Sequence, residues 1–125
     1  MAFTDDASIP NDEELLRRVP PWCIVADQNR AGQMRASSAA FDDPEMSVDL
    51  ASVRRARGEL FTATLAGHEG FGLVFITAGV ARAKQQTVSR APLPDNPAHG
   101  IVAGKKTGSV RNHFRDHCVP VFMPT

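Results

Sequence analysis

Hydrophobic residues follow one another most closely in FGLVFITA, residues 71–78, which is apolar at nearly every position. A run of this length predicts a central strand that is covered on both faces. The segment 46–51 instead alternates, with Met46, Val48 and Leu50 on one side, and this pattern predicts a half-buried strand. Further strands are expected at WCIVA (22–26), TVSRA (87–91) and HGIVAG (99–104).

The helical patterns of the chain are shorter than its strand patterns. Asn11 is followed by Glu14, which matches a capping box, so a short helix is expected to end before the two prolines at 20–21. Residues 52–70 fit either periodicity, and we favour a short helix that ends at Gly67. The remaining segments are expected to form a short helix or turn at 79–86, a helix at 107–117, and a proline-broken tail or edge strand at 118–124.

Together these elements predict a single small α+β domain, with a mixed or mostly antiparallel sheet of about four or five strands and two to four short helices. The connections are too short for several βαβ crossovers of about 30 residues each, so a doubly wound sheet is not expected. Residues 1–9 are expected to be a flexible N-terminal tail, and residues 10–125 the domain.

Charge is balanced overall but divided unevenly along the chain. Residues 1–60 carry 11 acidic and 7 basic side chains, and residues 61–125 carry 3 acidic and 7 basic ones. The zero net charge argues against a generic nucleic-acid coat, whereas the basic second half is either composition noise or a sign of an anionic partner.

Targeting signals and a disulfide framework are both absent from the sequence pattern. The first residues lack a basic and an apolar region, and the longest apolar run is too short to cross a bilayer. Two cysteines are fewer than small secreted scaffolds carry. We therefore expect a soluble, cytoplasmic protein with reduced thiols and no membrane partner.

The stretch NPAHGIVAGKKTGS, residues 96–109, has the appearance of a phosphate-binding loop. A Walker A loop requires four residues between its glycines and a hydroxyl directly after the lysine. Here three residues separate Gly100 from Gly104, and Thr107 stands one position late. The spacing therefore argues against a P-loop.

A simpler anion site is compatible with the same segment. A helix that begins near Thr107 would offer free backbone amides and a partial positive charge. Lys105 and Lys106 stand beside that terminus, and Arg111 and Arg115 follow on the helix. We predict these five residues as ligands of a phosphate, the alternative being a capped helix with solvated lysines.

Histidines supply the candidate acid–base and metal chemistry. His99, at the start of a predicted strand near two lysines, is the predicted general acid or base, the alternative being a residue that bonds a turn carbonyl. His113 and His117 have the spacing of a two-histidine metal site and are followed by Cys118. Without a CxxC or HExxH motif, no metal is predicted, and no cofactor is identified.

A second candidate site combines an arginine with a serine-bearing segment. Arg18 follows LLR, and Ser37 and Ser38 lie in the small-residue stretch before Phe41. An early arginine, a serine-bearing strand and a later acid resemble the outline of ADP-ribosyltransferase-like enzymes. The resemblance implies that Arg18 holds the pyrophosphate of NAD and that Ser38 and an acid, either Glu45 or Glu69, complete the site. No G-x-S-x-G elbow marks either serine as a hydrolase nucleophile.

The sequence is therefore compatible with three functions. The first is recognition of a phosphate-bearing ligand, a nucleotide or an RNA end, through the basic C-terminal segment. The second is an NAD-handling, ADP-ribosyltransferase-like enzyme, and the third is a non-enzymatic protein-interaction subunit. A protein partner or self-association through residues 119–123 is compatible with each.

Overall fold

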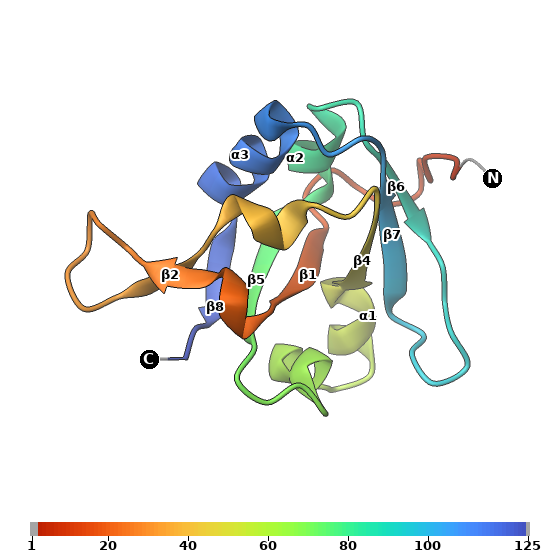
Figure 1. Cartoon of the computed structure of the whole chain (residues 1–125). Coiled ribbons are helices and arrows are strands. Elements are labelled where there is room, and N and C mark those ends of the chain that lie inside the picture. Colours follow the sequence, from red (N-terminus) through yellow and green to blue (C-terminus); the bar gives the residue numbers. More distant parts are fainter. Residues whose placement is uncertain (1–2, 125) are drawn as a thin grey trace.

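The centre of the molecule is a six-stranded antiparallel sheet with the order β6-β7-β4-β1-β5-β8 (Figure 1). The computed structural model describes residues 3–124. The strands of this sheet are β1 (Glu14–Val19), β4 (Glu45–Leu50), β5 (Gly72–Thr77), β6 (Thr87–Arg90), β7 (His99–Ala103) and β8 (Val119–Phe122). A separate hairpin is formed by β2 (Ile24–Ala26) and β3 (Met34–Ala36).

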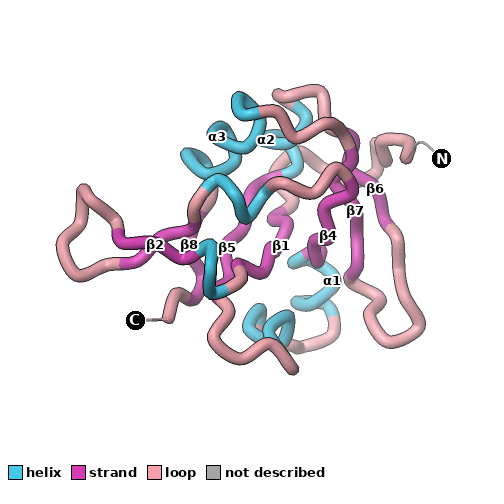
Figure 2. Tube along the Cα trace, viewed as in Figure 1, coloured by secondary structure: helices cyan, strands magenta, loops and turns pink. Residues whose placement is uncertain are grey.

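Helices lie on both sides of the sheet. The α-helices are α1 (Ala51–Ala56), α2 (Ala78–Arg82) and α3 (Gly108–His117), and three 3-10 helices are η1 (Pro21–Cys23), η2 (Ser38–Phe41) and η3 (Phe61–Leu65). Figure 2 shows α2 and α3 on one side of the strands and α1 on the other. The predicted α+β domain with an antiparallel sheet is confirmed, but the main sheet has six strands rather than four or five.

The larger core lies on the face covered by α2, α3 and η2. Side chains of β1, β4 and β5 there, such as Leu15, Val48 and Ile76, are almost completely buried. Phe41 of η2 and Phe114 of α3 meet edge to face at 6.0 Å between ring centroids, a favourable aromatic geometry. We call this side of the sheet the covered face.

The opposite face has a smaller apolar cluster and a polar region beside it. Leu16 and Leu73 are buried there together with Ala51 of α1, and Phe61 and Leu65 of η3 pack against them. Alternation along the strands places Arg18, Ser47, Asp49 and His99 on this same face, because paired residues of antiparallel strands point to the same side. We call this side the polar face.

The sheet opens between its two central strands. β1 is paired with β5 over all six of its residues, but with β4 only at Leu15↔Leu50 and Leu16↔Asp49. Beyond these positions Arg17 crosses the gap, with Nε donating to the carbonyl of Ala40 at 3.1 Å and Nη1 to that of Ser47 at 3.0 Å. A side chain thus takes the place of strand pairing.

One predicted element is wrong: residues 14–19 form a strand and not a helix. The segment has period-two alternation, since Leu15 and Val19 face the main core while Leu16 and Arg18 face the other side. Hydrogen bonds from strands on both sides outweigh the weak local capping signal of Asn11 and Glu14.

The other predicted elements are largely confirmed. The strands expected within 46–51, 71–78, 87–91 and 99–104 and the last helix are present, and residues 119–122 form an edge strand. In the ambiguous region 52–70 the favoured single helix ending at Gly67 is wrong, because Gly58 adopts a left-handed conformation that ends α1 before it, and the later residues form the 3-10 helix η3. In the segment WCIVA only its last three residues are strand, since Trp22 and Cys23 belong to η1.

The segment expected to be a flexible tail has defined contacts in residues 3–9, and residues 1–2 lie outside the described part. The Asp6 amide donates to the carbonyl of Val88 at 2.8 Å, so this segment lies along the edge strand β6. Ile9 is fully buried, and Arg82 donates to its carbonyl at 2.9 Å. Across residues 3–124 no helix is long and apolar enough to cross a membrane.

Candidate ligand pocket

A partly enclosed pocket of about 290 Å³ lies on the polar face, where β1 and β4 diverge. We call it the β1–β4 pocket. It is lined by Leu16, Arg17, Arg18, Ser47, Val48, Asp49, Thr64, Leu93, Asp95, Asn96 and His99. The pocket therefore exists because the central strands separate, and polar side chains from β1, β4, β7 and η3 surround it.

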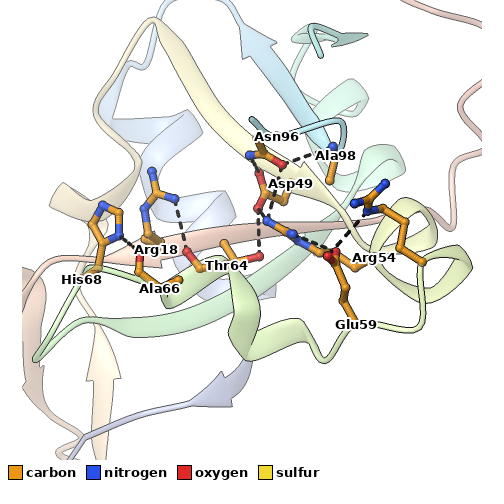
Figure 3. A network of polar contacts seen from close by, with 10 residues as sticks. Arg18, Asp49, Arg54, Glu59, Thr64, Ala66, His68, Asn96 and Ala98 are labelled. Atoms are coloured by element: carbon orange, nitrogen blue, oxygen red, sulfur yellow. Dashed lines mark hydrogen bonds and ion pairs between the residues drawn. The ribbon is translucent and has the colours of Figure 1, made fainter. Parts of the chain in front are cut away.

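Asp49 is the most buried charged group of the pocket, with 3% of its side chain exposed. It accepts hydrogen bonds from Arg54 at 2.7 Å, Thr64 at 2.9 Å and Asn96 at 2.9 Å (Figure 3). Burial alone would raise the pKa of Asp49, but these hydrogen bonds and the charge of Arg54 hold it below its ordinary value. Asp49 is therefore an ionised anchor that ties α1, η3 and the turn before β7 to β4.

His99 and Ser47 form a hydrogen-bonded pair in the pocket. His99 Nδ1 lies 2.8 Å from the carbonyl oxygen of Ala91, and its Nε2 lies 3.2 Å from Ser47 Oγ. Because a carbonyl only accepts, Nδ1 carries the proton, and in the neutral ring Nε2 is left as an acceptor. The neutral ring is therefore held with its basic nitrogen toward the serine hydroxyl.

Arg18 supplies a cation whose hydrogen-bonding capacity is largely unused. Its single hydrogen bond among residues 3–124 is from Nη1 to the carbonyl of Thr64, at 3.3 Å. No carboxylate in that described part lies within ion-pair distance of Arg18. Figure 3 shows its guanidinium group between Thr64 and His68. Most of its five N–H donors are thus available to a ligand.

The predicted phosphate ligands of the C-terminal segment are not gathered around one site. Lys106 is 6% exposed, and its Nζ donates to the carbonyls of Val102 at 3.0 Å and Gly104 at 2.9 Å. Burial lowers the pKa of Lys106 to about 8. Lys105 is exposed and lies with Thr107 beside a different, shallower pocket.

The other predicted ligands of this segment are also engaged within the chain. Thr107 caps α3 by accepting from the Val110 amide at 3.3 Å. Arg111 donates to the carbonyl of Lys106 at 2.6 Å, and Arg115 pairs with Asp116 at 2.9 Å. His99 lies in the β1–β4 pocket, whose lining includes none of these residues.

The serine site predicted beside Arg18 is only partly assembled. Arg18 lines the β1–β4 pocket, but Ser37 and Ser38 stand at the start of η2 and do not line it. Glu45 and Glu69 are exposed and do not line it either. The serine that lines the pocket is Ser47. The alternation of residues 46–51 already placed Ser47 on the side opposite the apolar residues of that segment.

Metal-ligand geometry is also absent from residues 3–124, where no three His, Cys, Asp or Glu side chains are grouped for an ion. The rings of His113 and His117 are 4.2 Å apart, and burial, followed by the charge of His117, lowers the pKa of His113. Burial raises the pKa of the neighbouring Cys118 thiol to about 11, which makes it a poor thiolate ligand at neutral pH.

Comparison with known proteins found no matching family model, no matching curated protein and no matching solved structure. The geometry of the β1–β4 pocket is therefore the basis for a functional proposal.

Proposed function

We propose that the protein is an enzyme that binds a phosphate-bearing nucleotide, with NAD as the leading candidate, in the β1–β4 pocket. The observation that carries the proposal is that a cation with unused donors, Arg18, and an oriented base, the His99–Ser47 pair, line the same pocket. Convergence of a phosphate-binding cation with acid–base groups in a partly enclosed pocket is typical of catalytic sites.

Arg18 is suited to hold the phosphate part of the ligand. A guanidinium group presents its donors in a planar fork that matches two phosphate oxygens. The one buried carboxylate of the pocket, Asp49, is neutralised by its ion pair with Arg54 at 2.7 Å, so it repels an anion less than a free carboxylate would.

His99 is suited to take a proton from a nucleophile. In hydrolysis of NAD, the bond between the nicotinamide nitrogen and the ribose carbon breaks, and its electron pair leaves with nicotinamide. A water oxygen forms the new bond to that carbon, and the water proton passes to His99 Nε2, directly or through Ser47 Oγ. An acceptor hydroxyl in place of water would make the same reaction a transfer of ADP-ribose.

The proposal modifies the resemblance to ADP-ribosyltransferase-like enzymes. It keeps Arg18 as the phosphate ligand, but assigns the serine role to Ser47 of β4 instead of Ser38. His99 of β7, the strand paired with β4, takes the place of the acid that the resemblance assigned to Glu45 or Glu69. Three strands of one sheet would then contribute one side chain each.

Thermal stability in the presence of ligands tests the binding half of the proposal. NAD and ADP-ribose are expected to raise the midpoint of unfolding, because a ligand that binds only the native state stabilises it. The shift should disappear in Arg18→Ala and persist in Lys105→Ala, which removes an exposed cation of the C-terminal segment. A shift lost in Lys105→Ala instead would favour the basic segment, and no shift at all would contradict the proposal.

Nicotinamide release from NAD tests the catalytic half. His99→Gln and Ser47→Ala should keep the ligand-induced shift, while His99→Gln lowers turnover about 10²–10⁴-fold, the usual contribution of a general base. Turnover that is unaffected by His99→Gln would show that the pair is not part of the chemistry.

A further inference from the structure

Trp22 is far more exposed than a tryptophan usually is. It is the only tryptophan of the chain, and 79% of it is accessible to solvent. Its ring meets Phe71 edge on at 6.3 Å between centroids, and Phe71 in turn meets His68 edge on at 5.0 Å. These three residues, the aromatic cluster, form a supported surface whose outermost ring has no covering side chain.

The aromatic cluster lies near Arg18 but outside the β1–β4 pocket, whose lining includes none of its three residues. Arg18 is paired with Leu73 on β5, and Phe71 directly precedes the first residue of that strand. Trp22 belongs to η1, which follows the end of β1. Figure 3 shows the Arg18 side chain beside His68, the third member of the cluster.

We infer that the aromatic cluster is the stacking subsite for the heteroaromatic base of the nucleotide whose phosphate Arg18 binds. The inference rests on the proposed function and specifies where its ligand extends. A nucleotide carries its base one sugar away from its phosphate, and the exposed Trp22 belongs to η1, which follows the strand that carries Arg18. Aromatic side chains that present a free face bind any base by stacking, and Arg18 fixes the anionic end.

The composition of the chain makes this subsite directly observable. Because the protein has one tryptophan and no tyrosine, its intrinsic fluorescence comes almost entirely from Trp22. NAD is expected to quench this fluorescence when its base stacks on the ring. Ribose 5-phosphate, which has a phosphate but no base, should raise the unfolding midpoint through Arg18 without quenching.

Affinity measurements on variants give a second readout. Trp22→Ala is expected to weaken NAD binding about tenfold or more, the usual effect of removing one stacked ring, and to leave ribose 5-phosphate binding unchanged. Trp22→Phe should recover most of the affinity. Leu60→Ala is the matched control, because Leu60 is 78% exposed and lies outside the cluster.

These measurements distinguish a failure of the stacking subsite from a failure of the proposed function. If NAD produces an Arg18-dependent thermal shift but neither quenches Trp22 nor loses affinity in Trp22→Ala, the subsite is overturned and the proposed function stands. If no phosphate ligand gives an Arg18-dependent shift, the proposed function fails and the subsite fails with it. If NAD quenches Trp22 equally well in Arg18→Ala, then Arg18 and the aromatic cluster do not bind the same ligand molecule, and the inference is overturned.

Discussion

Arg17 and Arg18 are neighbours on β1 and both border the β1–β4 pocket, yet their guanidinium groups have different hydrogen-bond partners. Arg17 donates to the carbonyls of Ala40 and Ser47 and closes the gap between the central strands. Arg18 makes one long hydrogen bond and lines the pocket on the polar face. The surroundings of a cation, and not its type or its position in the sequence, therefore decide whether it stabilises the fold or is available to a ligand.

The two faces of the sheet show the same contrast. The covered face is packed with apolar side chains of five strands, β1, β4, β5, β6 and β7, and of the helices α2, α3 and η2. The one arginine of β1 on this face, Arg17, is engaged by backbone carbonyls. The polar face packs only a small cluster and leaves a pocket lined by Arg18, Ser47 and His99. We therefore expect substitutions on the covered face to change mainly stability, and those on the polar face to change mainly ligand binding or turnover.

The largest effect is expected from Phe114→Ala on the covered face. Phe114 is fully buried against Phe41, so its truncation removes a large apolar side chain and leaves a cavity. The free energy of unfolding, measured by urea denaturation, should fall by about 3–5 kcal/mol.

Ser47→Ala is the matched change on the polar face. It removes one hydrogen bond to His99 and should lower the free energy of unfolding by about 1 kcal/mol. Equal losses in Phe114→Ala and Ser47→Ala would contradict the division of the sheet into a structural and a functional face.

An effect smaller than that of Phe114→Ala is expected when the two arginines are compared directly. Arg17→Met leaves two backbone carbonyls without their donor in a part-buried place, so stability should fall by about 2 kcal/mol or more. Arg18→Met loses one weak bond and should stay within about 0.5 kcal/mol of the wild type. Similar urea midpoints for these two variants would show that Arg17 does not bridge the strands in solution.

Most of the sheet was predictable, because its strands carry local patterns. Alternation marks β4, and continuous apolar residues mark β5, so neither depends on knowing its neighbours. β1 was not predictable in this way, because six residues between a capping signal and two prolines fit a helical turn as well as a strand. Its identity is decided by β4 and β5, which are distant in the sequence.

The candidate site was predictable only in its separate members. Arg18 and His99 were expected to matter, but the sequence placed them in two different sites, and the structure places both in one pocket. The pocket arises from the incomplete pairing of β1 with β4, which is a tertiary feature without a local signal. The basic C-terminal segment had the stronger sequence signal, but burial of Lys106 and the backbone bond of Arg111 depend on contacts that sequence spacing does not reveal.

A further effect, visible through its pH dependence, is expected at Lys106. Burial lowers its pKa to about 8 from an ordinary 10.5, with the charge of Asp43 opposing the shift and that of Arg17 adding to it. The unfolded chain therefore binds this proton more tightly than the folded protein does. Unfolding takes up a proton between pH about 8 and 10.5, so in that range Lys106 makes the free energy of unfolding rise with pH.

Urea denaturation at a series of alkaline pH values measures this contribution as a difference between variants. Lys106→Met removes the titrating group, so the gap between its stability and that of the wild type should shift in favour of the wild type as pH rises through this range. Lys105→Met is the matched control, because Lys105 is exposed and its removal should leave the pH profile unchanged. Parallel pH profiles for the wild type and Lys106→Met would mean that the Lys106 ammonium is as well solvated as that of Lys105. Lys106 would then be a cation available to a ligand, like Arg18, and not one held by the fold.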